Sequence, residues 1–327
     1  MTFVHYHVRH ETLYEYGQVV GESHHLLRLT PRALPWQKNL EHHLAIAPEP
    51  SVQRTFLDSF GNRITAIHFT ADHDYLKITS EFWVELRDRP KPSVDATKVA
   101  WESVRDSLRY RADRKFSPEH LEATAFRFVS PNVPIDSRYA AYARESFLPG
   151  RPLIEAADAL MKQIHRDFSF DPSATETFTP VEEAFQARRG VCQDFSHIMI
   201  ACLRSIGLAA RYMSGYILTH PPEGKKRLVG ADATHAWVAV FVPEYGWLEL
   251  DPTNALWPGL EHITLGWGRD FSDITPMRGV LLGGGEHEPE IAVTVVPEEE
   301  FASLYGDGET YLDHLSISPP SSAMDPG

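Results

Sequence analysis

Long apolar runs and basic charge are both scarce in this chain of 327 residues. No stretch reaches the roughly 18 consecutive apolar residues of a membrane-spanning helix. The N-terminus lacks the basic segment followed by an apolar core that marks a secretion signal. Asp and Glu outnumber Lys and Arg by 45 to 31, which gives a formal net charge of −14 and no long-range attraction to nucleic acid or anionic membranes. The composition therefore predicts a globular, cytoplasmic protein that binds neither.

Cysteine is almost absent, with only Cys192 and Cys202 in the chain. Two cysteines cannot form a disulfide scaffold, and ten positions apart on one helix they would lie beyond bonding distance. They also leave no C-x-x-C pair for a structural zinc ion. Each cysteine is therefore either a small core residue or a reactive thiol.

Histidine, in contrast, is common, with 17 residues. His5 and His7 would share one face of a strand and could bind a metal ion, as could His24 with His25. No carboxylate stands near them at a spacing typical of zinc enzymes, and no calcium-binding loop is recognisable. The sequence therefore predicts neither a metal nor another cofactor.

Residues 1–88 show the alternation of apolar and polar positions that is typical of β-strands. The segments YHVRHETLYEY and YLKITSEFWVEL are rich in β-branched and aromatic residues, and Gly61 with Asn62 is a turn signal between two such runs. We expect an N-terminal β-sandwich domain here. Residues 89–150 begin with a charged, proline-rich segment, so we expect a linker and a helical connection.

From residue 151 to 300 a helical pattern gives way to a strand pattern. RPLIEAADALMKQIH has apolar residues at helical spacing, whereas ARYMSGYIL, HAWVAVFV, GWLELDPT and EIAVTVV alternate with period two. We therefore predict an α+β chain whose core domain, residues 151–300, packs helices on a second, antiparallel sheet. Residues 301–327 are polar, and we expect a flexible tail there.

Cys192 stands at the start of a predicted core helix. An apolar stripe at three- and four-residue spacing runs along this helix, made of Phe195, Ile198, Met199, Cys202, Leu203 and Ile206. Cys202 lies on that stripe, which indicates a core residue. At the N-terminus of the helix, free backbone N–H groups and the helix dipole favour a thiolate and can hold an oxyanion. The pattern thus favours Cys192 as a nucleophile.

A cysteine nucleophile needs a base and a group that orients the base, and His235 and Asp251 are the candidates. They flank one hairpin turn, VPEYGW. A three-residue loop at 243–245, with Gly246 in the left-handed region, would set Asp251 opposite Trp237 and diagonal to His235 on one face. An even-numbered loop would turn the side chains of His235 and Asp251 to opposite faces of the hairpin unless a bulge intervenes. The register of the hairpin therefore tests whether these two residues act together. The alternatives are a buried structural histidine and an aspartate that starts a turn.

Three ordered segments resemble the bacterial transglutaminase-like proteins, a family of candidate cysteine peptidases in the papain-like superfamily: GVCQDFSHIMIACLRSIGLAARYMSGY, THAWVAVFVPEYGWLELDPTN and GRDFSDITPMRGVLLGGG. The first 90 residues, with VRHETLYEY and LLRLTPR, resemble the β-sandwich domain that precedes the catalytic core in that family. By position, the resemblance implies that Cys192 is the nucleophile, His235 the base and acid, and Asp251 the orienting carboxylate.

The chain departs from the pattern of animal crosslinking transglutaminases. Those enzymes have Gln before and Trp after the nucleophile, where this chain has Val191 and Gln193. They also use an upstream tryptophan at the oxyanion, and no tryptophan occurs here between Trp101 and Trp237. These differences favour hydrolysis over crosslinking. The backbone N–H of Cys192 is the one oxyanion donor that the sequence indicates.

A further set of residues would support the site or line it: Gln193, Asp194, Tyr216, Trp237 and Asp270. Gln193 and Asp194 belong, with His197, to the family-like string CQDFSH, where hydrogen bonding to neighbouring loops is the alternative role. Core packing is the alternative for Tyr216, and turn capping is the alternative for Asp270.

The sequence thus predicts a cysteine enzyme that attacks peptide or carboxamide bonds through a Cys192 thioester, with a peptide or protein as substrate. Water would resolve the thioester in a peptidase or amidase, and an amine acceptor would do so in a transferase. The alternative from another class is a binding or scaffold protein that keeps the triad only as structure.

Overall fold

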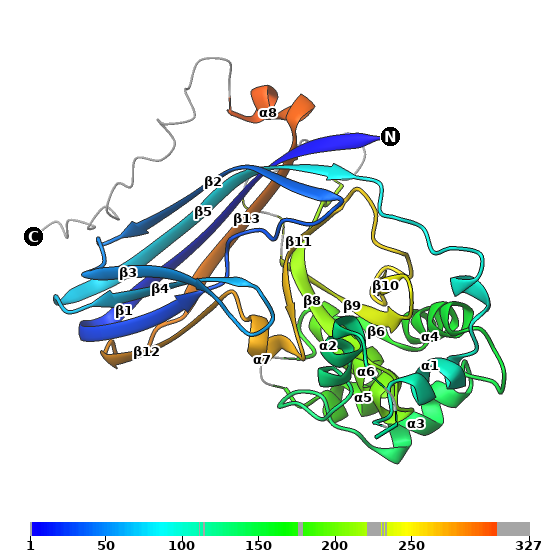
Figure 1. Ribbon diagram of the computed structural model, residues 1–327. Helices are drawn as coiled ribbons and strands as arrows, with labels where there is room; N and C mark the ends of the chain where they lie inside the picture. The colour runs from blue at the N-terminus through cyan, green and yellow to red at the C-terminus, as the bar shows by residue number, and fades with distance from the viewer. Residues whose placement is uncertain are drawn as a thin grey trace, which may run out of the picture. The chain divides into compact units, whose positions relative to one another are not determined.

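The computed structural model describes residues 2–110, 112–113, 115–175, 179–220, 230, 232 and 234–305 (Figure 1). The chain forms two compact units. The first unit comprises Met1–Arg87, Ile217–Ala233 and Pro276–Gly327, and the second comprises Asp88–Tyr216 and Thr234–Thr275. Sheets and helices occur together in the pattern that the sequence predicts, so the α+β class is confirmed.

An antiparallel sheet of seven strands builds the first unit. Its strands are β1 (Phe3–Leu27), β2 (Gln37–Ala47), β3 (Val52–Leu57), β4 (Arg63–Phe69), β5 (His73–Arg87), β12 (Met277–Gly283) and β13 (Pro289–Pro297). The order is β2-β5-β1-β4-β3, and β12 and β13 also pair with β1. The first half of β1 pairs with β5 and β13, and its second half pairs with β4 and β12. Because β1 has partners along both of its halves, it joins the seven strands into one continuous antiparallel sheet.

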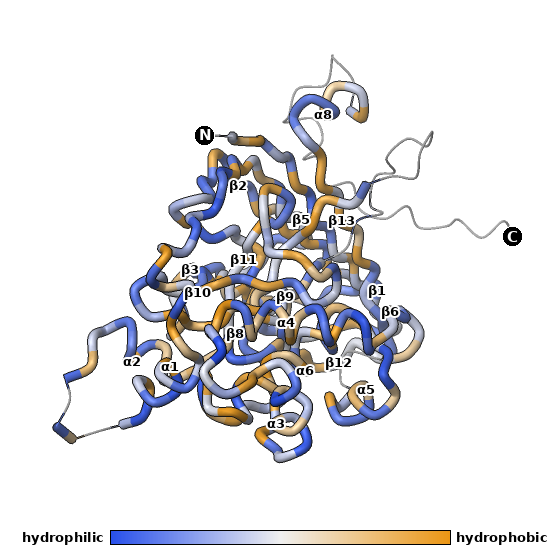
Figure 2. The backbone as a smooth tube through the Cα atoms, turned by 90° about the vertical axis from the view of Figure 1, so that its right-hand side faces the viewer, coloured by the Kyte–Doolittle hydropathy of each residue, from blue (hydrophilic) through white to orange (hydrophobic). Residues whose placement is uncertain are grey.

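Strand β13 corrects one prediction. The pattern of EIAVTVV assigns this segment to the second sheet, but it pairs with β1 from Tyr6↔Pro297 to Tyr14↔Pro289. Val293, Val295 and Val296 are buried there, and much of this strand is orange in Figure 2. Alternation identifies a strand but not its partner, which depends on the tertiary fold. The chain thus returns to the first unit after Thr275, inside the predicted core domain of residues 151–300.

The predicted flexible tail, residues 301–327, is described only at its start. Helix α8 (Glu298–Tyr305) includes the first of these residues. Phe301 packs against His7 and Trp83, with ring centroids 4.7 and 5.0 Å away. Residues 306–327 lie outside the described residues.

The second unit combines helices with a four-stranded sheet in the order β10-β9-β8-β11. Its sheet consists of β8 (Ala210–Ile217), β9 (Thr234–Val242), β10 (Gly246–Leu250) and β11 (His262–Gly268). The short strands β6 (Ser169–Phe170) and β7 (Arg189–Gly190) form a separate parallel pair. The helices are η1 (Ala96–Lys98), α1 (Trp101–Ser107), α2 (Pro118–Ala125), α3 (Ser137–Arg144), α4 (Leu153–Asp167), α5 (Val181–Ala187), α6 (Cys192–Ser205) and α7 (Phe271–Ile274).

Helix α6 is the central helix of the second unit. It packs on β9 and contacts α3, α4 and α5. Its predicted apolar stripe is buried, and Ile198, Met199 and Cys202 have no exposed surface. Apolar side chains at helical spacing bury one continuous face, which fixes the helix and thereby its first residue, Cys192. Among the described residues, no helix has both the length and the apolar character needed to span a membrane.

Candidate active site

Cys192 is the first residue of α6, and one residue, Val191, separates it from the short strand β7. Val191 is the N-cap residue, and its backbone N–H donates to Asp194 Oδ2 at 2.8 Å. The Thr175 hydroxyl donates to the same oxygen at 2.7 Å. Burial raises the pKa of Asp194, although both hydrogen bonds act to lower it. Asp194 therefore fixes the turn that leads into Cys192. Hydrogen bonding to neighbouring segments is the alternative role that the sequence analysis gives for Asp194.

The tight approach to this turn requires glycine at position 190. A Cβ atom on Gly190 would overlap Asp194 Oδ2 and lie 2.8 Å from the Cβ of Asp194. Neither contact is possible without movement of Asp194, which holds the N-terminus of α6. The string Gly190-Val191-Cys192 is thus shaped by packing, and its result is a cysteine at a helix N-terminus.

The two cysteines lie in different surroundings. Cys202 is fully buried, and burial raises the pKa of its thiol. Cys192 is partly accessible. Cys202 is thus a core residue, as its place on the apolar stripe predicts, whereas part of Cys192 is open to solvent.

The predicted register of the β9–β10 hairpin is confirmed. Gly246 pairs with Val242, so the loop has three residues, and Gly246 has a φ of +100°. The ladder continues to Leu250↔Val238, which sets the next residue, Asp251, opposite Trp237. His235 Nε2 lies 2.8 Å from Asp251 Oδ2 as a result.

His235 hydrogen bonds to both of its predicted partners. Burial would lower its pKa, but hydrogen bonds to Asp251 and to Cys192 outweigh burial and raise the pKa to about 10. Because Nε2 faces Asp251, Nδ1 is the ring nitrogen left for the thiol. An imidazole between a carboxylate and a thiol can take the thiol proton and later return it, because the carboxylate stabilises the imidazolium that forms.

Asp251 is fully buried and held by many donors. Its Oδ1 accepts hydrogen bonds from the backbone N–H groups of Thr253 and Asn254, at 2.9 and 3.2 Å. Its Oδ2 accepts from the Asn254 side chain at 2.8 Å, in addition to His235. Burial would raise the pKa of Asp251, but the hydrogen bonds from His235 and His262 keep it far below its usual value. The carboxylate is therefore ionised and fixed in orientation.

His262, at the start of β11, is a member of the cluster that the sequence reasoning missed. Its Nε2 lies 3.0 Å from Asp251 Oδ2. Burial lowers the pKa of His262 despite this carboxylate, so the ring is neutral and donates its Nε2–H. No local motif surrounds His262 in EHITLGW; the pairing of β11 with β8 brings it to Asp251.

Trp237 forms a buried wall of the cluster rather than an accessible surface. It has no exposed area, and its ring centroid lies 6.0 Å from that of His235 and 5.4 Å from that of His262. Its indole N–H donates to Glu249 Oε2 at 2.7 Å, and Arg89 pairs with the same oxygen at 3.3 Å. Glu249 thus accepts the indole N–H of Trp237, and the Trp237 ring packs against the rings of His235 and His262.

The remaining predicted residues lie in three settings. Gln193 follows Cys192 on α6 and is partly exposed. Tyr216 is fully buried and pairs with Thr234, so strand alternation turns it away from the face that carries His235. Asp270 is also fully buried, and caps α7 by accepting from the Ser272 N–H at 2.9 Å. In the structure, Tyr216 is thus a core residue and Asp270 is a helix cap.

His197, from the string CQDFSH, is buried on α6. Its Nε2 accepts the backbone N–H of Phe271 at 3.2 Å. Burial lowers the pKa of His197 to about 4. It is therefore a neutral histidine that ties α7 to α6.

Three atoms of the cluster also converge as ligands would. His235, Asp251 and His262 each offer one such atom, and these atoms lie within 4.8 Å of one another. Two imidazoles and a carboxylate are a donor set that zinc accepts. An ion at this place would replace the hydrogen bonds that orient His235, so it would block the thiol chemistry instead of assisting it.

Comparison with known proteins assigns the chain to a family. Residues 6–85 match the bacterial transglutaminase-like N-terminal region, and residues 140–252, which include Cys192, His235 and Asp251, match the transglutaminase-like superfamily. An uncharacterized protein of Mycobacterium tuberculosis is 39% identical over 302 residues, 90% of this chain and 93% of its own length. A protein-glutamine gamma-glutamyltransferase of Pseudomonas aeruginosa is 32% identical over 138 residues, 39% of this chain and 21% of that protein.

One solved structure is similar in fold along most of the chain. It comes from Cytophaga hutchinsonii and is described as a candidate cysteine protease. The TM-score is 0.71, with 17% sequence identity, and the match covers 91% of this chain and 92% of the other. The sequence matches and this fold agree, and the chain belongs to the bacterial transglutaminase-like family of the transglutaminase-like superfamily.

Proposed function

We propose that this protein is a cysteine enzyme that cleaves peptide or carboxamide bonds, with Cys192 as nucleophile, His235 as base and acid, and Asp251 as orienting carboxylate. The observation that carries the proposal is the position of His235. Its ring hydrogen bonds to Asp251 on one side and to Cys192 on the other. An accessible thiol at a helix N-terminus completes the arrangement.

The reaction follows from these positions. The Cys192 thiolate attacks the carbonyl carbon, and the negative charge that develops on oxygen faces the backbone N–H groups at the start of α6. The His235 imidazolium gives its proton to the departing amine or ammonia as the C–N bond breaks, which leaves a thioester on Cys192. His235 then takes a proton from water, whose oxygen attacks the thioester. The C–S bond then breaks, which releases a carboxylic acid and restores the Cys192 thiolate beside the His235 imidazolium.

Two arguments bear on the choice between hydrolysis and acyl transfer. Val191 and Gln193 stand where animal crosslinking enzymes have Gln and Trp, which favours water as acceptor. The relative from Pseudomonas aeruginosa carries the name of a glutamine acyltransferase, which favours an amine acceptor as the second candidate. We propose hydrolysis first, and acyl transfer to an amine as the alternative.

A library of peptides and carboxamides, incubated with the protein with and without an added primary amine, tests the proposal. Mass spectrometry would report hydrolysis as two fragments that together gain one water, or as a carboxamide that gains water and loses ammonia. It would report transfer as a product in which the added amine replaces the departing amine or ammonia. Cys192→Ser is the control for chemistry, and Cys202→Ser is the matched control for loss of a cysteine. A library that stays unchanged, together with a Cys192 thiol inert to iodoacetamide, would contradict the enzyme and favour a binding or scaffold protein.

A further inference from the structure

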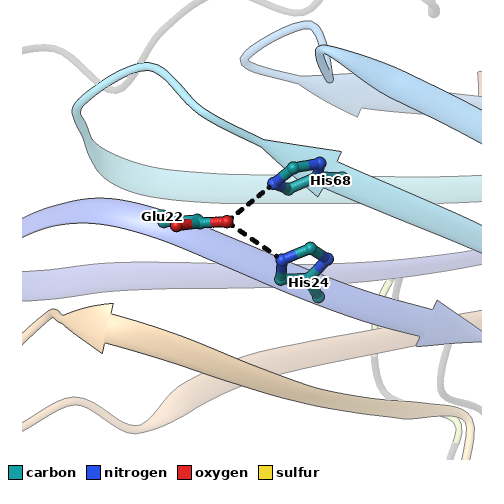
Figure 3. Close-up of side chains that lie close together, drawn as sticks. All are labelled: Glu22, His24 and His68. Carbon is teal, nitrogen blue, oxygen red and sulfur yellow. Dashed lines mark hydrogen bonds and ion pairs between the residues drawn. The ribbon is translucent and has the colours of Figure 1, made fainter.

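A cluster of two histidines and one glutamate that the proposed function does not use lies on the sheet of the first unit (Figure 3). Glu22 and His24 lie two residues apart on β1, so both side chains point to the same face. His68 on β4 is directly opposite His24 in the antiparallel ladder. The prediction that His24 and His25 together could bind a metal ion is wrong, because successive residues of a strand point to opposite faces.

The three side chains converge on one point. His24 Nε2 and His68 Nε2 each lie 3.2 Å from Glu22 Oε1. The two imidazole rings are stacked, with centroids 3.9 Å apart and planes 13° from parallel. One ligand atom from each residue lies within 4.8 Å of the other two.

These separations are those of ligands on one small cation. Zinc binds histidine nitrogen and carboxylate oxygen at about 2.0–2.2 Å, so two ligands in tetrahedral geometry lie roughly 3.3 Å apart. The 3.2 Å from Glu22 Oε1 to Nε2 of each histidine is close to that spacing.

We propose that Glu22, His24 and His68 bind one divalent transition-metal ion of the zinc type. Their side chains are 52%, 54% and 26% exposed, so an ion can enter from solvent and keep a fourth position open. The adjoining surface pocket is lined by Arg54 and Arg278, which favour an anion or hydroxide at that position. Because the ligands come from β1 and β4, the ion also ties these strands together.

Calorimetric titration of the full chain with Zn²⁺ tests the site. Cys192 is first alkylated with iodoacetamide, so that its thiol cannot bind the ion. We expect one ion per chain in the alkylated protein that also carries His262→Phe, because this change removes the second donor set, His235, Asp251 and His262. His68→Ala should weaken the affinity by roughly 100-fold, and Glu22→Gln by about 10- to 100-fold, since each removes one of three ligands. His43→Ala, which removes an exposed histidine of β2, should bind as the wild type does.

Co²⁺ gives a second readout, because it takes the place of zinc and its visible absorption reports the ligands. The wild type should gain this absorption and a higher Tm with metal, and His24→Ala should gain neither while keeping the wild-type Tm without metal. Equal affinities of His68→Ala and wild type would overturn the proposal, because the ion would then bind elsewhere. A wild type that binds no Zn²⁺ up to millimolar concentration would also overturn it.

Discussion

His262 Nε2 lies 3.0 Å from Asp251 Oδ2, the oxygen that also accepts from His235. The two histidines differ in charge at this shared oxygen. The pKa of His262 is lowered by burial, whereas the pKa of His235 is raised to about 10 by its hydrogen bonds to Asp251 and Cys192, which outweigh burial. His262 is therefore a neutral donor that holds Asp251 in place. The negative charge of Asp251 remains available to stabilise the His235 imidazolium. We regard it as a positioning residue.

Replacing His262 tests this role. His262→Phe keeps a ring but loses the donor to Asp251, and we expect kcat to fall roughly 10-fold with KM little changed, because a hydrogen bond to a charged group contributes about 1.5–3 kcal/mol. His262→Gln retains an N–H donor and should recover most of the rate. Steady-state kinetics of both variants, with Tm measured in parallel, separate positioning from stability. Equal losses in the two variants would show that packing matters and the donor does not.

Asp251→Asn should keep the fold and lower kcat by roughly 10- to 1000-fold. The neutral amide no longer stabilises the His235 imidazolium and can hold the wrong tautomer. The corresponding change in a serine protease lowers kcat by about 10⁴-fold, and a thiol that is already ionised would lose less. The measurement is turnover together with the rate of Cys192 alkylation against pH. Superimposable alkylation profiles with equal turnover would remove Asp251 from the mechanism.

The two cysteines give a matched pair of substitutions. Cys192→Ser should abolish turnover with an unchanged fold, because a neutral hydroxyl is a weak nucleophile in a site built for a thiolate. Cys202→Ser should leave kcat unchanged and lower the free energy of unfolding by about 1–3 kcal/mol, since it buries a hydroxyl in the apolar stripe of α6. Turnover and urea unfolding measure the two effects. Wild-type activity in Cys192→Ser would refute the mechanism.

The pH dependence of stability tests the raised pKa of His235. The folded chain holds this proton to about pH 10, whereas the ordinary value is 6.5. The contribution to the free energy of unfolding is therefore fully present below pH 6.5 and is lost as the pH rises toward 10. Asp251→Asn removes the carboxylate whose hydrogen bond and charge raise this pKa, so the stability of the variant should fall less across this range. Urea unfolding at several pH values between these limits would detect the difference, and parallel curves would contradict it.

Gly215 tests the close approach of β11 to β8. A Cβ atom at Gly215 would overlap the Ile263 carbonyl oxygen, next to His262. Gly215→Ala should therefore destabilise the chain by about 1–3 kcal/mol or more and disturb the position of His262. Gly259→Ala, which meets nothing within 4 Å, should stay within about 0.5 kcal/mol of wild type. Thermal unfolding of both variants is the measurement, and equal Tm values would contradict the expected contact.

Much of the candidate site could be predicted because its signals are local. An apolar stripe at helical spacing places Cys192 at the N-terminus of a buried helix, and the loop length in VPEYGW sets the hairpin register that joins His235 to Asp251. Both signals lie within a few residues of the groups that they position. The α+β class follows in the same way, from the change of period along the chain.

The sequence alone thus determined the strands, the core helix and the candidate residues Cys192, His235 and Asp251, each of which has a local signal. Only the tertiary structure decided which distant strands pair. Pairing of β13 with β1, of β11 beside β8, and of β4 with β1 depends on burial summed over whole faces, which no local pattern encodes. His262 reaches Asp251, and His68 reaches His24, through those pairings. For that reason the contact of His235 with Asp251 could be predicted from the sequence, and the second histidine of each cluster could not.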